Sequence, residues 1–171
     1  MPAIMFPRNG TSSPLKLSAR TAEQARAEIL RAHPAAEPEV RRIGLADLAS
    51  VEEFAGGLVA DGRPLDLLLN SAGVVFPPVR HETADGFELQ LGSNFLGPFA
   101  LTVRLPLLLR APAARVVTMS SGVAARGEID FGDIGAPAVV RPTKKALDRD
   151  VAARLWAEAE RLTGVTVPAA L

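Results

Sequence analysis

Leu65-Asp66-Leu67-Leu68-Leu69-Asn70-Ser71-Ala72-Gly73 is the stretch of this sequence that decides the fold. Its first five residues are apolar at nearly every position, as strands are when both faces of a sheet are covered. Small and polar residues follow at once, which indicates a tight turn at the strand's carboxyl end. The stretch therefore predicts a central strand of a parallel sheet, buried on both faces, over residues 65–69.

Strand and helix patterns alternate outward from this stretch in both directions. Strands are expected at 15–19, 39–45 and 115–119. Helices are expected at 21–33, from residue 50 to a turn at 61–64, at 83–109 and at 143–163. This order implies right-handed crossovers and a parallel sheet with helices on both faces. The expected fold class is therefore α/β.

Two capping boxes predict where helices begin. Thr21 with Gln24, and Ser50 with Glu53, have the spacing at which two side chains satisfy the free backbone donors of a first helical turn. Gly164 follows the last apolar stripe and predicts the end of the last helix. The sequence thus marks two helix starts and one helix end.

Composition narrows the function classes. The 171 residues carry 19 basic and 19 acidic side chains, so no nucleic acid or anionic membrane is expected as a partner. Cysteine is absent and only His33 and His81 remain as soft ligands, so neither disulfides nor a metal site are expected. The amino terminus does not read as a signal peptide, and the apolar stretch 95–109 is too interrupted to span a bilayer. A cytoplasmic protein is expected.

Three segments in order resemble the short-chain dehydrogenase/reductase family, and most closely its retinol-dehydrogenase-like branch, over residues 15–134. They are Asn70-Ser71-Ala72-Gly73-Val74, then Asn94-Phe95-Leu96-Gly97-Pro98-Phe99, then Val116-Val117-Thr118-Met119-Ser120-Ser121. Each falls at the expected end of a strand or on the following helix. The resemblance implies an incomplete Rossmann-like sheet and an NAD(P)-dependent oxidoreductase acting on an alcohol or a carbonyl compound.

The resemblance also implies roles for individual residues. Asn70, Ala72 and Gly73 match the family motif that lies close to the cofactor. Asn94 matches the helix residue that holds a proton-relay water, and Ser121 matches the serine that hydrogen-bonds the substrate oxygen. Ser121 and Asn94 are thus the candidate catalytic residues.

Arg20 bears on the choice of nucleotide. A basic residue at the end of a second strand tolerates the extra phosphate of NADP, whereas an acidic one favours NAD. Arg20 therefore favours NADP over NAD, and a solvated arginine before a helix is the alternative interpretation.

The glycine-rich turn that such enzymes place between their first strand and helix is not found in this sequence. Residues 15–20 resemble the family's second strand, and only fourteen residues precede them. A parallel crossover needs a dozen or more connecting residues. Residues 3–6 are therefore expected to pair, if at all, as an antiparallel hairpin across 8–14.

The family's proton donor, a tyrosine followed four residues later by a lysine, also has no counterpart, because the chain contains no tyrosine. One alignment places Lys144 at the lysine and Val140 where the acid belongs, and whether Lys144 or Lys145 matches the family lysine stays open. A second alignment sets residues 154–165 against the carboxyl-terminal tail of the retinol-dehydrogenase-like members. Both alignments stay open at this point.

These observations predict a single degenerate Rossmann-like domain over 1–171, with an irregular amino terminus (1–14), a family-like region (15–134) and a helical tail (135–171). The expected function is that of a short-chain dehydrogenase-like protein, inactive or severely impaired as this chain because the acid and the phosphate cradle are lacking. The alternatives are a non-catalytic module that forms homo- or hetero-oligomers through the helix around 94–109, and a truncated gene product.

Overall fold

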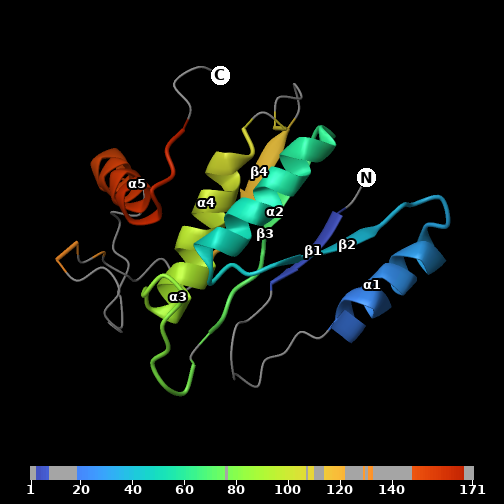
Figure 1. Ribbon diagram of the computed structural model, residues 1–171, viewed down its shortest axis with the longest axis horizontal. Helices are drawn as coiled ribbons and strands as arrows, with labels where there is room; N and C mark the ends of the chain where they lie inside the picture. Colours follow the sequence, from blue (N-terminus) through green and yellow to red (C-terminus); the bar gives the residue numbers. More distant parts are fainter. Residues whose placement is uncertain are drawn as a thin grey trace.

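The computed structural model describes residues 3–7, 19–75, 77–106, 108–109, 114–121, 129, 131–132 and 148–167. Strands and helices alternate along them (Figure 1). They are β1 (Ala3–Pro7), α1 (Ala19–Ala32), β2 (Glu39–Ile43), α2 (Leu48–Asp61), β3 (Leu67–Asn70), α3 (Leu89–Leu91), the π-helical turn η1 (Gly92–Leu96), α4 (Gly97–Arg104), β4 (Arg115–Thr118) and α5 (Arg149–Thr163).

The described strands form two parallel pairs. β1 pairs with β2, and β3 pairs with β4, with Leu67 opposite Arg115 and Asn70 opposite Thr118. Helices flank both pairs, so the expected α/β class with parallel pairing is confirmed. Within the described residues, the two pairs do not join into one ladder.

One hydrophobic core joins the two pairs. The side chains of Val51, Phe54 and Leu58 on α2 belong to the same buried cluster as Ile43 of β2 and Leu68 of β3. α2 also packs along α4, and Figure 1 shows the two helices side by side in front of β3 and β4. The predicted apolar stripe of α2 is therefore confirmed.

The expected antiparallel pairing of the amino-terminal segment is wrong. β1 lies parallel to β2, with Ala3 opposite Glu39 and Pro7 opposite Ile43. Its partner follows α1, so the crossover runs over the whole stretch from Pro7 to Glu39 and is long enough for a parallel connection. Part of the segment that was expected to be irregular is thus a strand.

The expected burial of both faces of β3 is also wrong. Leu68 is 3% exposed and faces the core, whereas Leu67 and Leu69 are 57% and 51% exposed. Side chains alternate between the faces of a strand, so one face is covered by α2 and α4 and no described residue buries the other. An apolar run shows that a strand can be buried but not that both of its sides are covered.

The helix starts differ from those that the capping boxes predict. α1 begins at Ala19, two residues before Thr21, so the predicted strand over 15–19 does not extend to Ala19; residues 15–18 lie outside the described residues. α2 begins at Leu48, capped by Asp47, whose carboxylate accepts from Ala49 and Ser50 N–H. Ser50 Oγ instead accepts from Gly44 N–H at 2.9 Å.

The helix expected over 83–109 is shorter and irregular. Thr83 Oγ1 accepts from the N–H groups of Asp85 and Phe87, and Gly86 has φ +82°, so this segment is a turn. The helix starts at Leu89 after the cap Glu88 and ends at Arg104. Leu96 and Leu101 inside it, and Leu105 directly after it, are at most 2% exposed, so these side chains are buried in the core.

The last helix ends where the sequence predicts. Gly164 caps α5 with φ 66°, in the left-handed region that glycine adopts without strain. Asp148 caps its start, and residues 143–147 of the expected helix lie outside the described part of the chain. The rings of Trp156 on α5 and Phe99 on α4 pack edge to face, with their centroids 4.9 Å apart, and this contact joins the two helices.

Candidate functional site

β3 and β4 end at the same edge of their sheet. Asn70, the last residue of β3, lies opposite Thr118, the last residue of β4. The loop 71–75 and the segment containing Ser121 therefore leave from neighbouring points, at the carboxyl ends of parallel strands. This is where open α/β sheets bind ligands.

Asn70 connects both strands to α4. Its Nδ2 donates to Thr102 Oγ1 at 3.1 Å and lies 3.5 Å from Thr118 Oγ1. Thr102 Oγ1 donates its own proton to the Pro98 carbonyl at 2.8 Å, which leaves its lone pairs free to accept. Asn70 thus has a structural role at the site, and its two threonine partners, 32 and 48 residues away in the sequence, have no local sequence signal.

Asn94 clamps the loop that follows β3. Its Oδ1 accepts from Val74 N–H at 2.8 Å, and its Nδ2 donates to the Val74 carbonyl at 2.7 Å. Asn94 lies in η1, and such π-turns inside helices occur frequently at functional sites. Because both ends of the carboxamide bind Val74, the side chain holds the loop in place.

Gly73 lies directly under this clamp. A Cβ atom at residue 73 would lie 3.0 Å from Asn94 Oδ1, which is tighter than nearly all Cβ contacts, so the close approach favours glycine. Ala72 packs half-buried against the core. The small residues that the family motif places here thus permit contact between the loop and η1.

The other predicted site residues lie at different places. Ser121 is exposed just beyond β4, at the same edge as the Asn94 clamp. Arg20 lies in the first turn of α1, beside the β1–β2 pair, so the structure does not bring it into the β3–β4 edge. Val140, Lys144 and Lys145 lie outside the described residues, and neither alignment of the lysine is tested.

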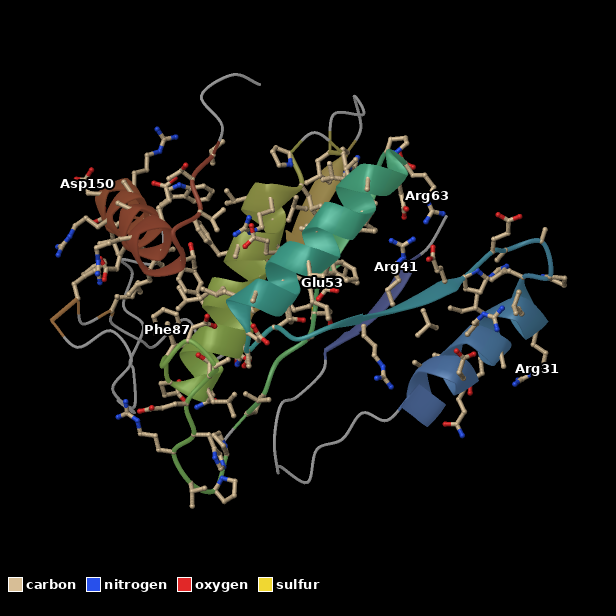
Figure 2. All side chains as sticks on the ribbon, viewed as in Figure 1. Arg31, Arg41, Glu53, Arg63, Phe87 and Asp150 are labelled. Carbon is tan, nitrogen blue, oxygen red and sulfur yellow. The ribbon has the colours of Figure 1, made fainter. Side chains whose placement is uncertain are left out.

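The perturbed ionisable groups of β2 lie away from this edge. Hydrogen bonds from Arg41, and then from Arg63, hold the pKa of Glu39 below its usual value. Arg41 also pairs with Asp61 at the end of α2, and Figure 2 shows Arg41 and Arg63 on the same side of that helix. This Glu39 cluster (Glu39, Arg41, Asp61 and Arg63) ties the start of β2 to the end of α2. Among the described residues, no group of three His, Asp or Glu side chains could hold a metal ion.

The starts of α2 and α5 do not fit the pyrophosphate of a dinucleotide. Pyrophosphate binds where free N–H groups of a helix start point at the anion. At α2, the N–H of Leu48 donates to Asp85, and those of Ala49 and Ser50 donate to Asp47. Two carboxylates thus occupy the donors and would repel a phosphate.

The start of α5 is closed in the same way. Its cap Asp148 accepts from the N–H groups of Asp150 and Val151. No pyrophosphate cradle is therefore found at the start of α2 or of α5. No helix within the described residues has the length and apolar character to cross a bilayer.

Comparison with known families gives a match over most of the chain. The family model described as short chain dehydrogenase matches residues 9–133. The match includes β2 to β4 and both loops of the candidate site, while β1 lies before its first residue.

Known relatives are dehydrogenases and oxidoreductases. Polyprenol dehydrogenase of Mus musculus is 50% identical over 97 residues, which are 54% of this chain and 29% of the relative. Human retinol dehydrogenase 12 is 45% identical over 96 residues, 56% of this chain and 30% of the relative. A Streptomyces antibioticus protein named "Probable oxidoreductase" is 37% identical over 158 residues, 87% of this chain and 51% of the relative.

A solved structure has the same fold. An uncharacterized protein from Mycobacterium Paratuberculosis superposes with a TM-score of 0.67 at 25% identity, covering 84% of this chain and 82% of that one. The present chain spans under a third of the two mammalian relatives and about half of the Streptomyces one.

Proposed function

This chain belongs to the short-chain dehydrogenase family, and from that premise we propose that its β3–β4 edge orients the oxygen of an alcohol or carbonyl substrate for NAD(P)-dependent oxidoreduction. The observation that carries the proposal is the Asn94 clamp on Val74, which fixes the loop after β3 beside the end of β4. Ser121 follows β4 there, exposed to solvent.

Ser121 is the residue that contacts the substrate in this proposal. Its hydroxyl donates a hydrogen bond to the substrate oxygen and stabilises the negative charge that develops there during reduction. Asn94 acts as a positioning residue in this proposal, because both ends of its carboxamide bind the backbone of Val74. The family generally binds NAD(P), and the preference for NADP rests on Arg20 alone.

In this proposal, residues 1–171 by themselves catalyse the oxidoreduction at a rate close to that of the uncatalysed reaction. The chain has no tyrosine to supply a phenolic proton, and a missing general acid costs about 10²- to 10⁴-fold in rate. In addition, the first N–H groups of α2 and α5 already donate to carboxylates and are not free to bind a phosphate, so the affinity for the nucleotide is low.

The relatives' names favour an apolar alcohol or aldehyde as the substrate class. Polyprenol and retinol dehydrogenases are named for long apolar alcohols. A straight-chain alcohol such as 1-decanol is therefore a suitable probe for the site.

A titration of the purified chain with 1-decanol, followed by amide chemical shifts, tests the proposal. Chemical-shift changes should concentrate at Ser121 and Val74, and the affinity for 1-decanol should fall by about tenfold in Ser121→Ala, as expected when one hydrogen bond to the substrate oxygen is lost. Thr166→Ala removes an exposed hydroxyl elsewhere and should leave the shifts unchanged. Chemical-shift changes that are the same in the wild type and in Ser121→Ala, or that occur on α5 instead, would refute the proposed role.

A further inference from the structure

Among the described residues, no strand pairs with the edge of β3 that faces away from β4. The carbonyls of Asp66 and Asn70 accept from the N–H groups of Arg115 and Met119, at 2.9 and 2.8 Å, so these residues point toward β4. Backbone groups alternate between the two edges of a parallel strand. Leu67 and Leu69 therefore direct their N–H and C=O groups to the opposite edge, where no described residue pairs with them.

The same two residues begin an uncovered apolar strip. Leu67 and Leu69 are 57% and 51% exposed, and on the same face of β4 and just beyond it Val117 and Met119 are 42% and 61% exposed. On the opposite face Leu68 is 3% exposed and belongs to the core that α2 and α4 share, while Val116 beside it is 44% exposed. An open backbone edge thus borders directly on exposed aliphatic side chains.

The opening lies within the domain. Ile43 of β2 and Leu68 of β3 share one core beneath α2, yet the described strands form two separate ladders. Helices and small molecules do not offer alternating donors and acceptors at the spacing of a strand, whereas an extended chain does. The chemistry of the edge therefore selects an extended polypeptide with apolar side chains.

We propose that the open edge of β3 accepts an extended apolar segment of another polypeptide, which adds as a strand beside Leu67 and Leu69 and covers the strip that they form with Val117 and Met119. Backbone hydrogen bonds hold the segment, and alternate side chains pack on the strip. This inference is independent of the proposed catalytic role.

Amide exchange of the chain with a short, end-capped synthetic peptide of alternating valine and threonine tests the proposal. The amides of Leu67 and Leu69 should slow by about tenfold or more, since they gain partners in the complex. The amides of Val116 and Thr118, which point to the outer edge of β4, should not change. A peptide of the same sequence with N-methyl groups along one edge should have no effect.

Substitution of the strip supplies the second arm. Leu69→Lys places a charge on the strip at a half-exposed position and should abolish the peptide's effect while the chain stays folded. Val59→Lys, at an exposed apolar position of α2, is the matched control and should preserve binding.

Four outcomes would overturn the proposal. The first is protection at Val116 and Thr118 instead of Leu67 and Leu69. The second is an equal effect of the N-methylated peptide. The third is full protection of the two leucine amides in the free monomer, because the chain would then cover its own edge. The fourth is protection that rises with protein concentration alone, which would assign the edge to a second copy.

Discussion

The carboxamide of Asn94 makes two hydrogen bonds to the backbone of one residue, Val74, at 2.8 and 2.7 Å. Asn94 lies in a π-turn at the start of the helix that precedes β4, while Val74 lies in the loop after β3. The contact thus fixes the geometry of the candidate site across 20 residues of sequence. An amide side chain suits this position because it donates and accepts at the same time.

Substitution of Asn94 tests this clamp. Asn94→Ala removes both bonds and should lower the free energy of unfolding by about 1–2 kcal/mol, with loss of exchange protection at the Val74 amide. Asn94→Asp keeps an acceptor for Val74 N–H but loses the donor, so that amide should stay protected. Urea denaturation and amide exchange measure both effects, and unchanged exchange in the alanine variant would contradict the clamp.

Gly92 and Thr83 should be energetically coupled. A Cβ at residue 92 would overlap the Cγ2 methyl of Thr83, so Gly92→Ala should destabilise the fold by about 1–3 kcal/mol. Thr83→Ser removes that methyl and keeps the hydroxyl that accepts from Phe87 N–H. In a double-mutant cycle the cost of Gly92→Ala should fall by about 1–2 kcal/mol in the serine background.

Gly97→Ala is the matched comparison for that cycle. Its Cβ would overlap the backbone carbonyl of Leu45, which no side-chain substitution can remove. Thr83→Ser should therefore leave unchanged the loss of unfolding free energy that Gly97→Ala causes. If Thr83→Ser reduced the cost of Gly92→Ala and of Gly97→Ala by the same amount, the result would contradict the local packing of η1 and α4.

Asp47 should stabilise the start of α2. Asp47→Ala leaves the N–H groups of Ala49 and Ser50 without their carboxylate partner and should cost about 1 kcal/mol of unfolding free energy. Asp47→Ser restores an acceptor at the cap and should recover most of the loss. Equilibrium urea unfolding compares the three proteins, and full stability in Asp47→Ala would disprove the assigned cap.

The Glu39 cluster predicts a pH dependence with a defined sign. Hydrogen bonds from Arg41 and Arg63 lower the pKa of Glu39 below its ordinary value of 4.5 in the folded chain. The stabilisation is therefore complete above 4.5 and is lost as the pH falls from there through the folded pKa. Glu39→Gln should reduce the loss of stability on acidification, with Glu37→Gln as the nearby control.

Because Glu39 is exposed, the effect should be small and should shrink at high salt. Urea midpoints at neutral and acidic pH, in low and high salt, measure it. An acid loss of stability that is identical in wild type and Glu39→Gln would contradict the assignment.

The strand ends and the motifs near them were predictable from the sequence. β4 ends at Thr118, one residue before the expected end at Met119, because small residues follow its apolar run at Ser120-Ser121, and α5 ends before Gly164 because glycine adopts the left-handed cap. Both signals are local. The parallel order of β3 and β4 places at one sheet edge the loop that Asn94 binds and the start of the segment that contains Ser121.

The features that were missed depend on contacts between distant residues. Ser50 fits a capping box, but Asp47 and the remote Asp85 satisfy the first N–H groups of α2 instead. The partner of β1 is chosen by a crossover that no local pattern reveals. The exposure of Leu67 and Leu69 depends on what covers the far side of the sheet, which an apolar run does not specify.

Titration of the purified chain with NADPH and with NADH, followed by nucleotide fluorescence, tests the central claim most directly. If residues 1–171 carry the substrate side of the site without a pyrophosphate cradle, neither nucleotide should saturate the chain up to about 1 mM, the range of a binding free energy near 4 kcal/mol. Saturable binding near 1 μM, with reduction of an aldehyde that Ser121→Ala abolishes, would contradict it.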